Sequence, residues 1–470
     1  MRTGLPEAEW DWGSPTFKAL GQHKVELVAK ALVWNLEIVI TDCDALVLRE
    51  PFAYMARWPD AGYLTTSDCL GNTTGSNDGG LEDHGCLSSA MNIGYMYFNV
   101  SAKPMVDAWL QALRRNPRGS WDQQTFNTLA RVGLSTNANG LSDRRLFRSF
   151  GGRVVGGILP LALFAGGHNH FVSRMAWRKG VEPYSVHTTF QYGGAPGKRH
   201  RLREAMLWAD PPAYYAPRAG VLSYEPHIPA EMLAAGPTPR AHVAIMLHQL
   251  RQLRAALVLA STLGRRLVLP RLTCLMDKYW APLSRSGVIP GAHAWAMPLT
   301  ACPLDHMLNP AELRPSTSAH VREYSFLSNP RLPPSFAASR NSTVVDPRGG
   351  GAEAQRLRAY RSSRVLHVTN LPEIADEIWL MQPPPRAKAS AAASEEPQGL
   401  ISDAEWRVFR STFAKLQGGW CCAPRGLKPN AAGFHTLHAS PRPGEKPRAP
   451  KRGRGRSGRG RGRMPALHLA

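Results

Sequence analysis

The sequence predicts an α/β protein with two successive α/β regions and a basic tail. Three observations support this prediction. Segments with helical spacing of apolar residues alternate with short apolar runs, which is typical of α/β domains. An acidic pair, Asp42 and Asp44, directly follows one of the apolar runs. A second helix-to-strand unit comes after the proline-interrupted stretch 210–229. With 470 residues, the chain is long enough for two or three domains.

The elements before residue 130 follow from local patterns. Helical spacing of apolar residues predicts helices, and short apolar or β-branched runs predict strands. In chain order, the pattern predicts a helix at 14–32, a strand at 37–41, a short helix at 51–57, strands at 63–66 and 90–99, and helices at 105–115 and 124–130. Glycine at position 94 permits a close approach to the strand backbone or marks a β-bulge, and the pattern allows both equally.

The pair Asp42 and Asp44 is the first candidate site. Residues two apart on a strand point to the same face, so both carboxylates are expected beyond the carboxyl end of strand 37–41, where α/β sheets bind ligands. Mn²⁺ or Mg²⁺ prefers such oxygen ligands and neutralises a diphosphate leaving group. An Asp-x-Asp also occurs by chance about once in a chain of this length. A turn capped by Asp is an equally good interpretation of the local motif.

His187 and Lys198 form a second candidate group. Histidine, a glycine turn at 193–194 and then a cation would suit a third metal ligand followed by a phosphate clamp. A lone histidine is more often a structural residue. The run 198–203 can equally be a solvated basic face.

Polar residues around two other predicted strands and a helix are candidates for sugar or donor contacts. Asp122 and Gln123, an acid beside an amide, follow the turn 116–119 and could face a sugar. Asp122 could equally cap the helix at 124–130. Asn92 is the binding candidate of strand 90–99, and Asp68 follows strand 63–66.

These segments resemble a known family. The sequences WGSPTF at 12–17, TDCD at 41–44, LTTSD at 64–68, NIG at 92–94, WDQ at 121–123 and HTTFQ at 187–191 occur in the order found in plant extensin arabinosyltransferases. The similarity continues through GKRHRLRE at 197–204 and VREYSFL at 321–327, so it covers most of residues 10–330. Members of that family belong to glycosyltransferase family 77 and have a GT-A type nucleotide-diphospho-sugar transferase domain.

The resemblance implies a metal-dependent, retaining glycosyltransferase. Its donor would be UDP-L-arabinofuranose, and its acceptor would be arabinosylated hydroxyproline on extensin-like cell-wall glycoproteins in the Golgi. The implied site residues are Asp42, Asp44 and His187 for Mn²⁺ (or Mg²⁺), Asp42, Asp68, Asn92 and Lys198 for the donor, and Asp122 and Gln123 as catalytic residues near the anomeric carbon. Sequence alone does not identify the linkage that is formed.

The predicted domain organisation has three parts. Residues 1–230 form the GT-A-like domain, 231–440 an accessory α/β domain, and 441–470 a disordered tail. The accessory domain has a predicted helix at 241–263, strands at 267–270 and 364–370, and a Pro/Ala/Ser-rich loop at 382–399. HQLRQ at 248–252 and LGRRLVLP at 263–270 faintly resemble protein O-fucosyltransferases.

The net charge of +22 overstates the basicity of the globular part. Residues 442–463 carry ten Lys or Arg and a single Glu, so the rest of the chain has a net charge of +13. The Arg-Gly tract lacks apolar residues that could pack, so it is predicted to be disordered. Such tracts can bind RNA through counterion release, but no interleaved aromatic residues indicate base stacking, and no specific nucleic acid is expected as a partner.

Seven cysteines occur without Cys-x-x-Cys spacing, so they give no zinc signature, and their disulfide pairing is left open. The chain has no apolar run near 20 residues and no signal-peptide pattern, whereas family members carry an amino-terminal Golgi membrane anchor. Because only 41 residues precede Asp42, we expect the first nucleotide-binding strand of the GT-A domain to be missing, the uridine pocket to be incomplete and the sequence to be a truncated gene model. The alternative function is therefore a non-catalytic binding or scaffold protein derived from a transferase.

Overall fold

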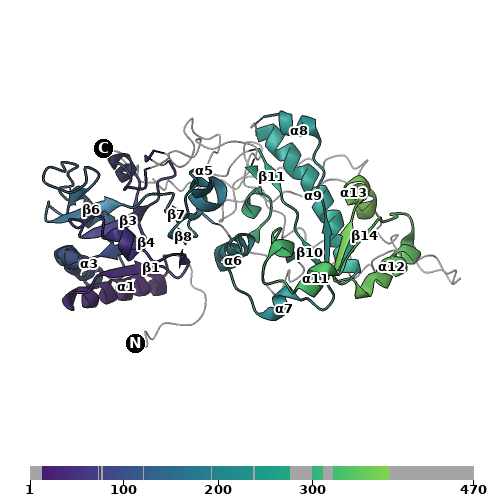
Figure 1. Ribbon diagram of the computed structural model, residues 1–470, viewed down its shortest axis with the longest axis horizontal. Helices are drawn as coiled ribbons and strands as arrows, with labels where there is room; N and C mark the ends of the chain where they lie inside the picture. The colour runs from purple at the N-terminus through teal and green to yellow at the C-terminus, as the bar shows by residue number, and fades with distance from the viewer. Residues whose placement is uncertain are drawn as a thin grey trace, which may run out of the picture. The chain divides into compact units, whose positions relative to one another are not determined.

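The computed structural model describes residues 13–380, except 72, 76–77, 120, 192, 237–238, 276–298 and 311–320 (Figure 1). The predicted loop at 382–399 and the predicted tail at 441–470 lie outside the described residues. Within them, the predicted α/β class is confirmed, because helices alternate with strands that form mixed and parallel sheets.

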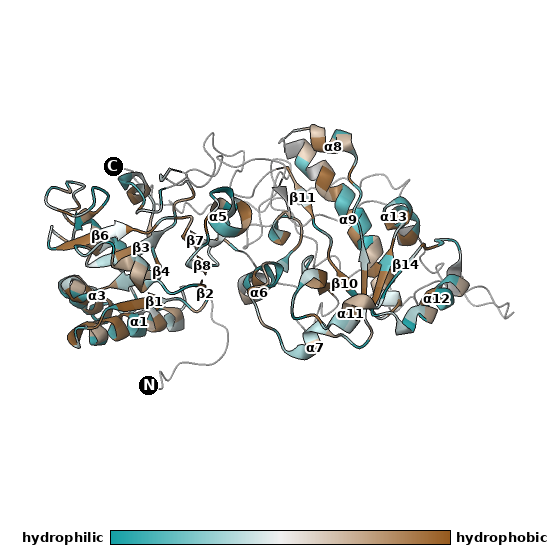
Figure 2. Ribbon diagram, in the orientation of Figure 1, coloured by the Kyte–Doolittle hydropathy of each residue, from teal (hydrophilic) through white to brown (hydrophobic). Residues whose placement is uncertain are grey.

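The first sheet is mixed and has five strands in the order β1-β4-β3-β6-β5. Its strands are β1 (Ile38–Thr41), β4 (Met91–Phe98), β3 (Tyr63–Ser67), β6 (Val154–Ile158) and β5 (Phe147–Ser149). Only the β3–β6 pair is parallel among the pairs of this sheet. In Figure 2, β1 and β6 carry the brown of hydrophobic residues.

Three helices begin where local signals predict. Helix α1 (Pro15–Val33) starts at Ser14, whose hydroxyl accepts a hydrogen bond from the Phe17 amide, and Pro15 suits its first turn. Helices α3 (Lys103–Arg115) and α4 (Asp122–Arg131) contact α1 and each other. The predicted helices at 14–32, 105–115 and 124–130 are therefore confirmed, with ends that differ by a few residues.

The two faces of the first sheet pack into different cores. Along β4, Met96 and Phe98 belong to the cluster that also contains Trp109 of α3 and Phe126 of α4. The alternate residues Tyr95 and Tyr97 pack in a second cluster with Tyr54, Trp58, Leu64 and Phe164. This alternation is the period of two that a strand imposes, and it leaves β4 buried on both faces.

A smaller sheet follows the turn after β1. Its strands are β2 (Ala45–Val47), β8 (Ser185–His187) and β7 (Phe164–Gly166), in the order β2-β8-β7. Strand β8 pairs with β2 in the antiparallel direction and with β7 in the parallel direction. This sheet joins a segment near residue 45 to a segment near residue 187.

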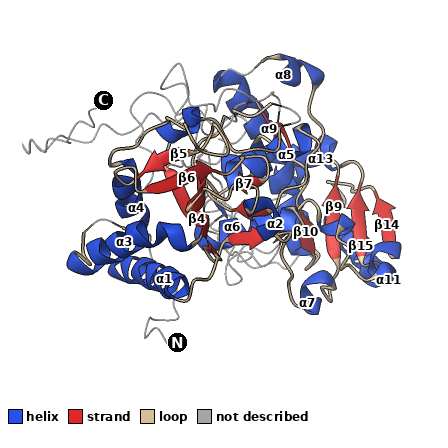
Figure 3. Ribbon diagram, turned by 60° about the vertical axis from the view of Figure 1, so that its left-hand side comes forward, coloured by secondary structure: helices blue, strands red, loops and turns tan. Residues whose placement is uncertain are grey.

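Five further strands form a parallel sheet in the order β13-β10-β9-β15-β14, and Figure 3 labels β10, β9, β15 and β14 of it. They are β13 (Val321–Arg322), β10 (Arg266–Val268), β9 (Val221–Tyr224), β15 (Val365–Val368) and β14 (Arg340–Thr343). The predicted helix at 241–263 is α9 (Pro239–Thr262), and it contacts α13 (Leu371–Leu380). The domain boundary at residue 230 stays a prediction, although β9 lies inside the stretch 210–229 that was predicted as a linker.

The other described elements are short. They are α2 (Phe52–Met55), α5 (Met175–Arg178), α6 (Gly194–Glu204), α7 (Pro212–Tyr215), α8 (Ala230–Ala234), α11 (Pro334–Ala338), α12 (Gly350–Arg358), β11 (Thr273–Cys274) and β12 (Leu299–Thr300). A disulfide joins Cys274 to Cys302, a pairing that the sequence left open. Among the helices of the described ranges, none is both long and apolar enough to cross a membrane.

Candidate active site

Asp42 and Asp44 lie in the turn between β1 and β2. The amide of Ala45 donates to the Asp42 carbonyl at 3.1 Å, which closes the turn, and the Asp42 amide donates to the Gly94 carbonyl of β4 at 2.9 Å. The turn interpretation of the motif is thus correct as local structure. It does not exclude a metal site, because both carboxylates still follow the end of a sheet strand, as predicted.

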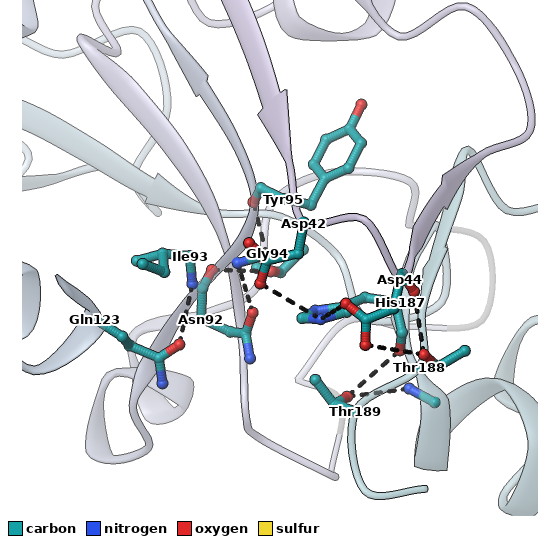
Figure 4. A network of polar contacts seen from close by, with 12 residues as sticks. Asp42, Asp44, Asn92, Ile93, Gly94, Tyr95, Gln123, His187, Thr188 and Thr189 are labelled. Carbon is teal, nitrogen blue, oxygen red and sulfur yellow. Dashed lines mark hydrogen bonds and ion pairs between the residues drawn. The ribbon is translucent and has the colours of Figure 1, made fainter. Parts of the chain in front are cut away.

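His187 reaches the aspartates through strand register. It ends β8, where it lies opposite Ala45 of β2 and beside Gly166 of β7. Its Nε2 lies 3.4 Å from Asp44 Oδ1 and 3.8 Å from Asp42 Oδ2. Figure 4 shows the imidazole between the two aspartates.

The three side chains fit a divalent ion. One ligand atom from each of Asp42, Asp44 and His187 lies within 4.8 Å of the other two. Two carboxylates and an imidazole are suitable ligands for Mn²⁺, which accepts both oxygen and nitrogen donors. These residues could hold the ion, and no other group of three or more His, Cys, Asp or Glu side chains with this spacing occurs in the described part of the chain.

Asp44 is surrounded by donors that keep it ionised. Lys198 of α6 forms an ion pair with Asp44 Oδ2, and the Thr188 hydroxyl donates to the same oxygen at 3.0 Å. Burial alone would raise the pKa of Asp44, but the hydrogen bond and charge of His187 and the charge of Lys198 hold this pKa well below its usual range. An ionised carboxylate is the form that binds a metal ion.

Lys198 is placed by the start of α6. Gly193 and Gly194 both have positive φ angles, 89° and 62°, which turn the chain into the helix. His200 and Arg201 on the same helix are buried, and Arg201 forms an ion pair with Glu204. The interpretation of 198–203 as a solvated basic face is therefore wrong for these two residues, because the helix buries one of its sides.

Gly94 lets His187 approach the sheet. A Cβ atom at position 94 would lie 2.0 Å from His187 Cε1, which no side chain can tolerate without displacing the ring. The β3–β4 register also shifts here, because Thr65 pairs with Met96 while Thr66 pairs with Asn92. Both interpretations of this glycine, the bulge and the close approach, therefore hold.

Asp68, Asn92 and Gln123 form one polar network. The Asn92 amide donates to Asp68 Oδ1 at 2.7 Å, and the Gln123 amide donates to Asp68 Oδ2 at 3.4 Å. The carbonyl oxygens of the two amide side chains accept from the backbone of Gly94 and Ile93, respectively (Figure 4). Burial raises the pKa of Asp68, while the bond from Asn92 opposes that shift.

Asp122 lies in the first turn of α4, next to a lysine that sequence reasoning missed. The N-cap residue is Trp121, and Asp122 Oδ1 accepts from the Gln123 amide at 3.0 Å, so Asp122 is not the cap itself. Lys24 Nζ lies 2.7 Å from Asp42 Oδ1 and 3.8 Å from Asp122 Oδ2. Lys24 thus links the predicted metal ligand to the predicted catalytic acid.

A signal for Lys24 does exist in the sequence. Lys24 is three residues after Gly21 and four before Val28, and both of these residues lie on the buried face of α1. A lysine on the apolar face of a helix needs a buried partner. Gly21 supports the same packing, because a Cβ there would lie 2.7 Å from the Asp122 carboxyl group.

Replacing Lys24 by Met is expected to move the acidic limb of the kcat–pH profile to higher pH. Burial raises the pKa of Asp122 and Lys24 lowers it, so loss of the ammonium leaves this pKa higher and reduces the ionised fraction. Activity at neutral pH should fall by roughly tenfold, because an opposite charge at this distance shifts the pKa of a carboxyl group by about one unit or more. Lys18→Met is the matched control, because Lys18 on the same helix bonds the carbonyls of Arg118 and Gly119. An unchanged profile in Lys24→Met would contradict a role for this contact.

The class of the protein follows from comparison with known families. The family described as nucleotide-diphospho-sugar transferase matches residues 4–202, which include every residue of the site. The protein is therefore a glycosyltransferase of this class.

Similarity to a characterised relative narrows the family. Arabinosyltransferase XEG113 of Arabidopsis thaliana is 34% identical over 469 residues, which cover 96% of this chain and 70% of the relative. The chain belongs to the family of extensin arabinosyltransferase-like proteins, as the sequence motifs indicated. No solved structure matches the chain.

Proposed function

We propose that the protein is a metal-dependent, retaining glycosyltransferase that moves L-arabinofuranose from UDP-arabinofuranose to arabinosylated hydroxyproline. One observation carries the metal-dependent part of this proposal. Asp42, Asp44 and His187 come from segments up to 145 residues apart in the chain, and their ligand atoms converge within 4.8 Å. A convergence of this kind, next to a lysine on a glycine-started helix, suits a diphosphate with its cation.

The charges of the site suit the departure of a nucleoside diphosphate. When bound, Mn²⁺ or Mg²⁺ would neutralise the charge that develops on the diphosphate as the glycosidic bond breaks. Lys198 would bind a phosphate oxygen, since its ammonium already lies beside Asp44 at the edge of the cluster. His187 and Thr188 would orient Asp44 by the contacts described above.

The network of Asp68, Asn92 and Gln123 would bind the sugar of the donor. Its polar atoms are held by neighbouring backbone amides, so the side chains are positioned before the ligand arrives. Asp122 would lie near the anomeric carbon, and the charge of Lys24 would favour the ionised form of the Asp122 carboxyl group. Asp122 and Gln123 would act together near the anomeric carbon, because both lie in the first turn of α4.

The sugar and the acceptor are proposed from the relative. Arabinosyltransferase XEG113 is named for arabinose transfer, and similarity over 96% of this chain supports the same donor here. An extensin-like hydroxyproline-rich glycoprotein would be the acceptor, and the Golgi would be the compartment.

The test is a transfer assay with UDP-arabinofuranose and a peptide that carries arabinosylated hydroxyproline. We expect arabinose incorporation that is lost on treatment with a chelator and restored by Mn²⁺. UDP-glucose and an unmodified peptide serve as controls for donor and acceptor. Transfer that continues at full rate after complete metal removal would contradict the metal-dependent part, and a folded chain that binds no UDP would indicate a non-catalytic binding protein.

A further inference from the structure

Two buried thiols lie together beside the donor network. Cys69 follows Asp68 directly, and Cys86 lies in the 3₁₀ helix His84–Ser88. Both thiols donate to the Gly71 carbonyl, Cys69 at 3.1 Å and Cys86 at 3.6 Å. Their residues are 7% and 0% exposed, whereas Cys43 is exposed.

The two thiols differ in acidity because they contact each other. A hydrogen bond from Cys86 lowers the pKa of Cys69, and the same bond, followed by burial, raises the pKa of Cys86. The shared Gly71 acceptor brings the two sulfur atoms together, and Cys69 is the more acidic thiol of the pair. Such an arrangement is typical of a dithiol that can be oxidised.

The segment between the two cysteines is tied down near their positions. Glu82, which is buried, accepts from the amide and hydroxyl of Thr73, both at 2.6 Å, and from the Leu161 amide at 2.8 Å. The Asn169 side chain donates to the Cys69 carbonyl at 3.1 Å. Together with the shared Gly71 acceptor, these contacts hold both ends of the 69–86 segment in one place in the native fold.

We propose that Cys69 and Cys86 form a disulfide when the protein meets an oxidising thiol–disulfide couple such as glutathione. The Cys69 thiolate attacks one sulfur of glutathione disulfide, and one glutathione leaves as the thiolate and takes up a proton. The Cys86 thiol then loses its proton and attacks the Cys69 sulfur, so the second glutathione leaves. Two electrons and two protons pass from the protein thiols to one glutathione disulfide.

Oxidation of this pair stabilises the donor network. Asp68 accepts from both Asn92 and Gln123, and its chain neighbour Cys69 would be fixed to the helical turn at Cys86. A ring closed across 69–86 restricts the backbone of Asp68 before the donor binds, so the oxidised form should bind UDP-sugar more tightly. This consequence rests on the proposed function, whereas the cross-link itself does not.

Peptide mapping tests the cross-link. The full chain is equilibrated with glutathione buffers that range from reducing to oxidising. It is then denatured in the presence of N-ethylmaleimide, which alkylates the free thiols. Cleavage after Glu82 places the two cysteines on different peptides. We expect a 69–86 linked peptide pair that replaces two alkylated peptides as the buffer becomes oxidising, while the exposed Cys43 is alkylated or carries glutathione and does not enter this linked pair. Quantitative alkylation of both Cys69 and Cys86 in the most oxidising buffer would overturn the proposal.

Binding measurements test the consequence separately. The Kd for UDP with Mn²⁺ should be about fivefold lower in the oxidised than in the reduced chain, a modest coupling between two sites. In Cys69→Ser/Cys86→Ser this redox dependence should vanish. Redox dependence that survives in the double variant would come from the other cysteines of the chain and would contradict the consequence. A linked peptide in a chain that binds no UDP would leave the cross-link established and the proposed function refuted.

Discussion

Replacing Asp44 by Asn is expected to abolish Mn²⁺-dependent UDP binding and to lower the transfer rate by at least about 100-fold. The carboxylate contacts His187, Thr188 and Lys198 at once, and Asn keeps its shape without the charge. A neutral side chain leaves the Lys198 ammonium without its ion-pair partner at this position and takes one anionic ligand from the cluster.

Isothermal titration calorimetry of UDP with and without Mn²⁺ measures the first effect, and the transfer assay measures the second. Asp107→Asn is the matched control, because Asp107 lies on α3 in an exposed ion pair with Lys103, and such pairs contribute little. Circular dichroism and the unfolding temperature show whether Asp44→Asn is folded. A folded Asp44→Asn chain with wild-type metal-dependent binding would remove Asp44 from the metal site.

Gly94→Ala is expected to disable the site through sterics alone. Its Cβ would lie 2.0 Å from His187 Cε1 and 2.4 Å from Nδ1, so the imidazole must leave its position between the aspartates. We expect Mn²⁺ affinity and transfer activity to fall by about 100-fold or more, together with a loss of about 1–3 kcal/mol in the free energy of unfolding from overpacking.

Gly75→Ala provides the control, since nothing lies within 4 Å of a Cβ at that position. Mn²⁺ titration and chemical denaturation of both variants separate the loss of the site from the loss of the fold. A second variant, Gly94→Ala/His187→Ala, relieves the clash. This double variant should regain stability without regaining metal binding, and stability that stays low would show that Gly94 matters for the strand rather than for His187.

Interactions between residues that are close in the sequence explain most of the helices and strands that could be predicted. The Ser14 cap followed by Pro15 places the start of α1, and the apolar run 36–40 places β1 directly before Asp42. Such signals depend on residues only a few positions apart, so they can be recognised in the sequence. The stretch 210–229 misled the prediction, because its prolines flank a four-residue buried strand, β9, that pairs with β10 and β15. A strand of four residues is too short to show an alternation of apolar and polar side chains.

Sequence by itself determined the α/β class, the family and the polar residues that lie at the strand ends. Tertiary structure alone decided that Lys24 pairs with Asp42 and Asp122, and that Cys69 lies beside Cys86. It also decided that Gly94 makes room for His187. The physical reason is that hydrophobic periodicity records which face of an element is buried, whereas strand register and helix packing decide which buried faces meet.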